Sequence, residues 1–162
     1  MRFSRMVVVA MLATAAGCAR MRGGPSGDSV TMTLGVGRQG AMDVARTQLQ
    51  HHGFTVTAVG DEMLVTAPKP VPEYLREVST AKPTPAQNWF LVVDVSDVRF
   101  FRGTHVRVSG YLMPPGAGTV AAVKNGKRLE QNAIPITQQN ARLFREVETA
   151  ASWIESEATR KK

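Results

Sequence analysis

The chain has 162 residues, of which 43% are hydrophobic and 20% charged, which is typical of one globular domain with its own core. Its single cysteine excludes an intramolecular disulfide framework. Lysines and arginines number 20 against 13 acidic residues, and the net charge is +7. This excess is modest and scattered. It fits either ordinary solubilising charge or contact with anionic lipid headgroups or cell-wall polymer.

The first residues have the pattern of an export signal. Arg2 and Arg5 precede an uncharged run from Met6 to Ala16. This run is too short to cross a bilayer as a helix, which needs about 20 residues. A basic start, a short apolar run and small residues before a cleavage site are typical of a secretory signal. We therefore expect residues 1–17 to be removed, and an exported protein is not expected to meet nucleic acid.

The only cysteine stands at the end of this signal, in Ala15-Ala16-Gly17-Cys18. These residues resemble the bacterial lipobox, which more often has leucine where this chain has Ala15. The resemblance implies that Cys18 is diacylated and anchors the protein, since two acyl chains hold stably where one does not. Ala19, in place of an aspartate, then favours the outer membrane facing the periplasm. Ordinary cleavage after Ala13-Thr14-Ala15 would instead leave a soluble periplasmic protein.

The segment after the cysteine is small, polar and contains glycine and proline, so residues 18–29 are expected to form a lipidated cysteine and a flexible tether. A single domain is expected over residues 30–158. It begins with a half-buried strand in which apolar and other residues alternate over 30–36. A helix over 41–52 follows, and Gly53 takes the position after its end. The apolar stripe of this helix comprises Ala41, Val44, Ala45, Leu49 and His52.

Two short strands, 54–59 and 63–67, flank Gly60-Asp61 and predict a hairpin. Residues 68–88 hold five prolines and form a loop, in which Pro72 can begin one short helix. This loop is a candidate flap or a surface that a partner protein recognises.

The strongest predicted strand pair is Trp89–Phe101 with Thr104–Met113. Alternation puts residues 89, 91, 93 and 95 on one face, and a bulge at Ser96-Asp97 would bring Val98 and Phe100 to the same side. The turn then falls at 101–103. In the resulting register, Val106, Val108, Gly110 and Leu112 lie opposite Val98, Val95, Val93 and Leu91. It also places Asp97 near Arg107 on the solvent face, and Asp94 opposite Ser109.

Residues 114–135 are ambiguous, and Asn125-Gly126 could turn a hairpin between 119–123 and 127–131. A long helix then runs from a cap at Thr137 to about Ala158, before a basic tail at 159–162. Its apolar stripe comprises Phe144, Val147, Ala151 and Ile154.

The element order β-α-β-β-β-β-α predicts an α+β fold, with a mostly antiparallel sheet of about four to six strands and two helices on one face. This order resembles that of the TBP-like, helix-grip domains of some envelope lipoproteins. The resemblance implies a sheet that grips the C-terminal helix, but a fold does not by itself give a function.

Three candidate sites, namely a glycine motif, a histidine pair and a possible hydrolase set, are not expected to be functional. Gly35–Gly40 reads G-x-G-x-x-G, but the strand before it alternates and the strand after it turns straight back, so we expect a simple strand-to-helix turn without a dinucleotide cofactor. His51 and His52 are adjacent and point to different sides, so no metal site is expected. Catalysis by Asp94, Ser96, Ser109 and His105 is not expected, because the predicted register leaves His105 beyond hydrogen-bond reach of Asp94 and Ser109.

Trp89, Phe90, Tyr111 and Met113 gather at one end of the strong hairpin and are expected to be plain core. The alternative is an apolar ligand groove beneath the long helix, lined by Trp89, Tyr111 and Phe144. Two functions remain open at this point. The first is a non-enzymatic binding or structural module that contacts an envelope protein or the cell wall, and the second is a carrier or sensor of a small apolar ligand.

Overall fold

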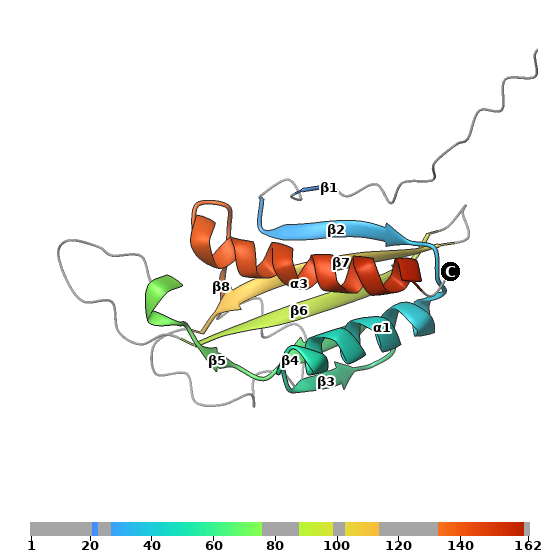
Figure 1. The fold of residues 1–162 in the computed structure, drawn as a ribbon, viewed down its shortest axis with the longest axis horizontal. Coiled ribbons are helices and arrows are strands. Elements are labelled where there is room, and N and C mark those ends of the chain that lie inside the picture. Colours follow the sequence, from blue (N-terminus) through green and yellow to red (C-terminus); the bar gives the residue numbers. More distant parts are fainter. Residues whose placement is uncertain (1–20, 23–26, 76–87, 99–102, 114–132, 161–162) are drawn as a thin grey trace, which may run out of the picture.

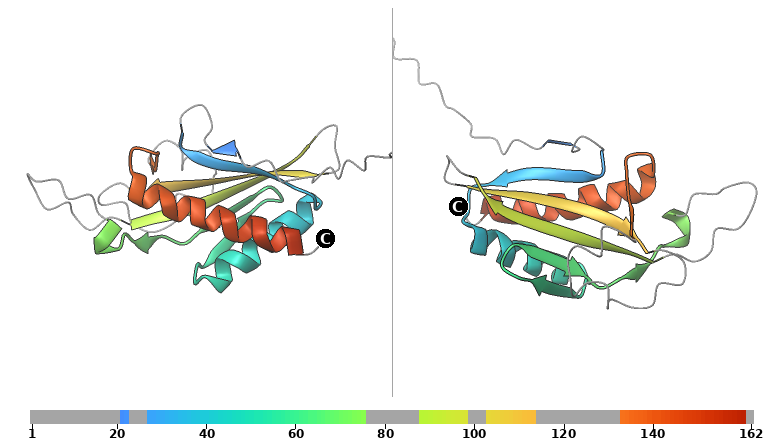
Figure 2. Two further views of the ribbon diagram at one scale, coloured as in Figure 1. Left: turned by 45° about the horizontal axis from the view of Figure 1, so that its top comes forward. Right: turned by 180° about the vertical axis from the view of Figure 1, so that it is seen from behind.

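A computed structural model describes residues 21–22, 27–75, 88–98, 103–113 and 133–160. These residues have an α+β fold in which one antiparallel sheet is covered on one face by two α-helices (Figure 1). The views in Figure 2 show both helices on the same side of the sheet. The predicted fold class is therefore confirmed.

The sheet has the strand order β1-β2-β7-β6-β4-β3, with β5 added beside β6 and β8 beside β7. Five strands have four or more residues: β2 (Ser29–Leu34), β3 (Val56–Val59), β4 (Met63–Thr66), β6 (Asn88–Asp97) and β7 (Thr104–Leu112). Three strands have two residues each, namely β1 (Met21–Arg22), β5 (Lys69–Pro70) and β8 (Ile134–Pro135). The short strands were not predicted, and β1 falls inside the segment expected to be a tether.

The first strand and helix form as their patterns predict. In β2 the side chains of Val30, Met32 and Leu34 are buried against the helices. Helix α1 (Arg38–His51) begins three residues before the expected start and buries the expected apolar stripe except for His52, which is exposed at the helix end. Gly53 has a φ of 75°, and the Phe54 N–H donates to Leu49 O over 2.9 Å, which ends the helix as predicted.

The strands β3 and β4 form the predicted hairpin, with Val56 opposite Thr66 and Val59 opposite Met63. The short helix expected from Pro72 is present as a single 3₁₀ turn, η1 (Glu73–Leu75), in which the Leu75 N–H donates to Pro72 O. The rest of the proline-bearing loop, residues 76–87, lies outside the described residues.

The strands β6 and β7 pair strongly, but two residues away from the predicted register. Val95 lies opposite Val106 and Val93 opposite Val108, whereas the prediction paired Val95 with Val108. The bulge at Ser96-Asp97 is also wrong, because the ladder continues regularly to Asp97 opposite Thr104. The Val98 N–H then donates to Gly103 O, so the connection is longer than the turn expected at 101–103.

The predicted ion pair between Asp97 and Arg107 is wrong for the same reason. Arg107 lies opposite Asp94, and its guanidinium is 3.4 Å from the carboxylate of Asp28. The error preserves the faces, since a shift of two residues keeps every side chain on its own side of the sheet.

The C-terminal helix α3 (Ala141–Arg160) starts four residues after the expected cap and continues to Arg160, into the expected tail. Thr137 lies in the turn before the helix, where its carbonyl accepts from the Asn140 N–H and its hydroxyl accepts from the Gln139 N–H. The predicted apolar stripe is buried. The hairpin considered within 114–132 lies outside the described residues.

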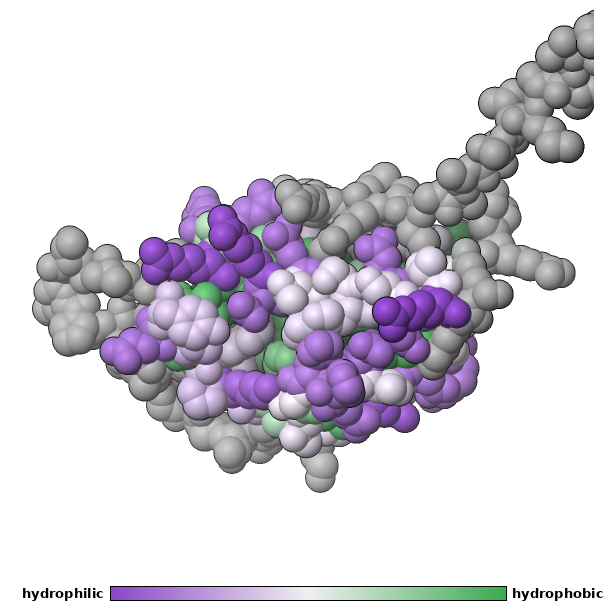
Figure 3. Space-filling model, viewed as in Figure 1, coloured by the Kyte–Doolittle hydropathy of each residue, from purple (hydrophilic) through white to green (hydrophobic). Residues whose placement is uncertain are grey.

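The main core lies between the sheet and the two helices. A Cβ atom on Gly110 would stand 2.6 Å from Val147 Cγ2 and 3.0 Å from Ile136 Cδ1, so this part of β7 and α3 are in close contact. The outer surface of the helices is mainly hydrophilic (Figure 3), as expected for amphipathic helices with one buried side.

Candidate functional site: the back face of the sheet

The sheet face opposite α1 and α3 is seen in Figure 2 (right) and is here called the back face. Its side chains alternate with those of the main core along each strand. In β7, Val106 and Val108 belong to the main core, so His105, Arg107, Ser109 and Tyr111 point the other way. The back face is the largest surface of the sheet that no described helix covers. It is therefore the candidate binding surface of the described fold.

One end of the back face is polar and exposed, and is called the polar end. Thr33, His105 and Ser96 lie side by side on β2, β7 and β6, and Arg107 follows His105 on β7. All four side chains are exposed. A polar and exposed sheet surface suits a macromolecular partner better than a small ligand, which needs a concave site.

The observed register also changes the positions of the serine, histidine and aspartate residues from which catalysis was not expected. Ser96 lies directly opposite His105, and Asp94 opposite Arg107, so Asp94 does not face Ser109. No hydrogen bond joins Ser96 to His105 in the part of the chain that the structure describes, and both side chains are exposed. The geometry brings the residue types closer than expected, but it does not supply the hydrogen-bonded contact that a triad needs.

Two buried hydroxyls follow along the back face. Ser29 on β2 lies opposite Ser109 on β7, and the side chains are 0% and 2% exposed. Neither hydroxyl oxygen has a hydrogen-bond partner among the described residues. An unsatisfied buried hydroxyl costs about 1–3 kcal/mol, so this pair is unusual for a stable interior.

The other end of the back face is apolar. Val65, Phe90 and Val92 are buried there and form a second cluster, with Met63 and Tyr111 partly buried against it. The rings of Phe90 and Tyr111 stack with their centroids 5.5 Å apart. Burial therefore increases along the back face from the exposed polar end to this apolar end.

The three residues expected to line a ligand groove are not brought together, and this expectation is corrected. Trp89 and Phe144 are buried in the main core at 5% and 4% exposure, whereas Tyr111 lies on the back face. The reason is the alternation of side chains along β7, in which Tyr111 follows Gly110 and must point away from α3. The close contact of Gly110 with Val147 also leaves no room for a ligand at that point.

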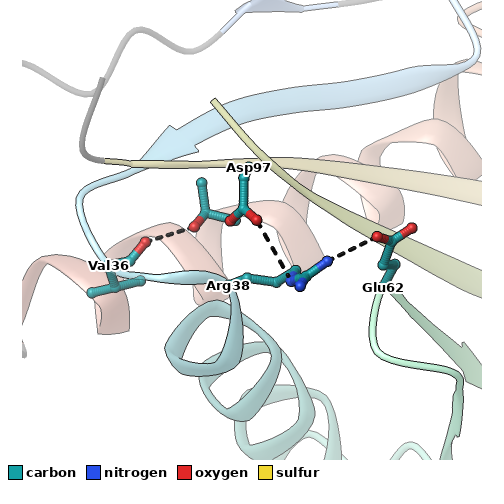
Figure 4. A network of polar contacts seen from close by, with 5 residues as sticks. Val36, Arg38, Glu62 and Asp97 are labelled. Atoms are coloured by element: carbon teal, nitrogen blue, oxygen red, sulfur yellow. Dashed lines mark hydrogen bonds and ion pairs between the residues drawn. The ribbon is translucent and has the colours of Figure 1, made fainter. Parts of the chain in front are cut away.

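The segment Gly35–Gly40 is a strand-to-helix turn beside an antiparallel sheet, unlike the parallel setting of a dinucleotide motif. A Cβ on Gly37 would meet nothing within 4 Å. The Arg38 guanidinium lies 2.8 Å from Glu62 and 3.7 Å from Asp97, and the Thr104 hydroxyl donates to Val36 O over 2.7 Å (Figure 4). These contacts fasten the turn to the sheet, and two carboxylates beside the helix start oppose a bound phosphate.

The two adjacent histidines have structural contacts. His52 stacks on Trp153 of α3, with centroids 3.5 Å apart and planes 7° apart, and His51 stands edge-on to His52. His52 therefore joins the end of α1 to α3. Among the described residues, no three or more histidine, cysteine or acidic side chains converge as a metal site would require.

A lysine packs against Phe54, which follows these histidines in the chain. The Lys69 ammonium lies 3.8 Å above the Phe54 ring, and the Phe54 ring meets Trp89 edge-on. Partial burial lowers the pKa of Lys69, whereas the ring face favours its charged form. Neither this contact nor the His52–Trp153 stack could be found from the sequence, because each joins residues that are distant along the chain.

Cys18, the residue expected to carry lipid, lies outside the described residues. None of the helices in the described ranges has the length and apolar character needed to cross a membrane. Comparison of the chain with models of known families and with curated proteins finds no significant match.

Proposed function

We propose that this protein is a lipid-anchored component of the bacterial cell envelope that acts by binding another envelope protein and not by catalysis. The sequence Ala15-Ala16-Gly17-Cys18 after an uncharged run carries the proposal. Two acyl chains on Cys18 hold the protein at the membrane, and Ala19 favours the outer membrane, facing the periplasm.

The start of the fold is compatible with such an anchor. β1 begins at Met21, three residues after Cys18, and three residues span at most about 10 Å. Because β1 pairs with β2, this edge of the sheet is held close to the membrane surface. An envelope partner at the same membrane is then within reach of the domain.

The polar end of the back face is the surface that we assign to the partner. It is exposed, and it offers hydroxyl, imidazole and guanidinium groups from three neighbouring strands. Such groups can pair with the backbone and side chains of a protein surface.

The anchor is tested by the intact mass of the protein purified from membranes. Wild type should carry acyl mass on Cys18, and Cys18→Ser should carry none. Ala15→Leu, which brings the sequence closer to the usual lipobox, is the matched control and should remain acylated. A wild-type protein that is cleaved but not acylated would refute the anchor and indicate a soluble periplasmic protein.

The partner surface is tested by affinity purification from detergent-solubilised envelopes, with mass spectrometry of proteins, lipids and glycans. His105→Glu should lose a stoichiometric protein partner, while Thr47→Glu, on the exposed side of α1, should keep it. Equal recovery by both variants would overturn the assignment of the polar end. Recovery of cell-wall glycan or a bound lipid without protein would overturn the choice of a protein partner.

A further inference from the structure

The strand β3 forms one edge of the sheet, and no described strand lies beyond it. Its sequence, Val56 to Val59, contains no charge, proline or glycine. Exposed edge strands usually carry such residues because they prevent pairing with another chain. At the opposite edge, β2 is partly covered by β1. Among the described strands of four or more residues, β3 is therefore the one whose whole outer edge has no strand beside it.

The hairpin contacts show which backbone groups of β3 face outward. The Thr55 carbonyl accepts from the Ala67 N–H over 2.7 Å, so the backbone of Thr55 points toward β4. Backbone groups alternate in direction along an antiparallel strand. The N–H and C=O groups of Val56 and Ala58 consequently point away from the sheet, and they have no hydrogen-bond partner in the described part of the chain.

These outward groups are complementary to themselves. When two copies of β3 run antiparallel with Thr57 opposite Thr57, Val56 of each copy lies opposite Ala58 of the other. Each such pair exchanges two backbone hydrogen bonds, so the contact closes with four bonds about a two-fold axis. The facing threonines on this axis form a favourable cross-strand pair.

The charges at the two ends of β3 favour the same arrangement. The exposed Asp61 lies in the turn after β3. Before β3 begins, the Lys69 ammonium lies near Gly53, 3.7 Å from the position that a Cβ atom on this glycine would take. Antiparallel pairing brings the acidic end of one copy to the basic end of the other, twice. Parallel pairing would bring like charges together, which is unfavourable.

We propose that β3 pairs antiparallel with β3 of a second copy of this chain, with Thr57 on the two-fold axis, and that the two sheets form one continuous sheet. This goes beyond the proposed function and does not depend on the lipid anchor. The contact is small, so the dimer forms reversibly and at high local concentration.

The pairing is tested by disulfide trapping in the full-length chain carrying Cys18→Ser, purified in detergent. In this background, the engineered cysteine is the only thiol. Thr57→Cys places two cysteines opposite each other in a non-hydrogen-bonded pair, with Cα atoms about 4.5 Å apart, and should form a dimer on mild oxidation with diamide. Thr55→Cys, which is also exposed, is the matched control. In the proposed register the two substituted positions lie four residues apart along the paired strands, about 13 Å, so no disulfide should form between them.

A second substitution tests whether the backbone carries the contact. Ala58→Pro removes an N–H that points outward and is not used within the hairpin, so the domain should keep its fold by circular dichroism. In the Thr57→Cys chain, it removes two of the four bonds and should weaken trapping by more than about tenfold. Ala58→Thr keeps the N–H and should trap normally.

Trapping of Thr57→Cys that exceeds that of Thr55→Cys and is lost with Ala58→Pro supports the proposal. Equal trapping at both positions, or trapping unaffected by the proline, would overturn it. The proposal would also be overturned if Thr57→Cys gave no dimer while another protein copurified with the chain. In that case the edge of β3 would pair with a strand of that other protein.

Discussion

The two faces of the sheet are formed by the same strands, yet they are built differently. On the face toward the helices, residues such as Val30, Leu91 and Val108 are fully buried, and β7 approaches α3 so closely that only glycine fits at position 110. On the back face, exposed polar residues lie next to two buried hydroxyls that have no hydrogen-bond partner in the described ranges. Close packing therefore distinguishes the face toward the helices, and side chains that can form hydrogen bonds distinguish the back face.

The largest difference between the faces should appear when one residue is truncated on each. Leu91→Ala removes a fully buried side chain between sheet and helices and should lower the free energy of unfolding by about 2–5 kcal/mol. Thr33→Ala, at the polar end of the back face, should change it by less than about 0.5 kcal/mol. Urea denaturation of both variants measures the difference, and similar losses would show that the two faces are equally packed.

Close packing on the helix side is tested at Gly110. Gly110→Ala places a methyl group against Val147 and should cost about 1–3 kcal/mol of stability. In a double-mutant cycle, Val147→Ala should relieve part of this cost and give a coupling energy of about 1 kcal/mol. Additive losses would mean that α3 is not in contact with β7 at this position.

Removal of a buried hydroxyl on the back face should not lower the free energy of unfolding, in contrast to the substitutions on the helix side. Ser109→Ala removes a hydroxyl that has no partner in the part of the chain that the structure describes, and should leave stability unchanged or raise it by up to about 1 kcal/mol. Thermal denaturation of Ser109→Ala, Ser29→Ala and the double variant measures this effect. A loss of more than about 1 kcal/mol would mean that the hydroxyl has a partner in the folded protein.

The smallest effect is expected at the exposed ion pairs of the turn before α1. Arg38→Gln removes contacts between a partly exposed arginine and the largely exposed Glu62 and Asp97, and should cost no more than about 1 kcal/mol. The cost should shrink at high salt, because exposed charges are screened. A larger loss that does not depend on salt would indicate that the arginine contributes through packing.

Much of the fold could be predicted because the patterns are local. The alternation of Val30, Met32 and Leu34 and the helical spacing of Phe144, Val147 and Ile154 each place one face of one element against the core. Gly53 was placed correctly at the end of α1, since few other residues tolerate its positive φ. The face of Tyr111 was also implied by alternation, so the groove beneath α3 could have been excluded from the sequence.

The candidate site was predicted less well because it depends on pairing between distant segments. The back face becomes a surface only when β2, β7 and β6 are in register, and apolar alternation is equally satisfied by registers two residues apart. The pairing of Ser29 with Ser109 and the stack of His52 on Trp153 have no local signal. The anchor at Cys18 and the envelope function stay predictions.

The sequence by itself determined where the five longer strands and the two α-helices lie and which side of each faces the core, because these follow from periodicities of two and 3.6 residues. Only the tertiary structure decided the register of β6 with β7, the addition of β1, β5 and β8, and the exposure of the β3 edge. These features depend on hydrogen bonds between segments far apart in the chain, which no local pattern specifies.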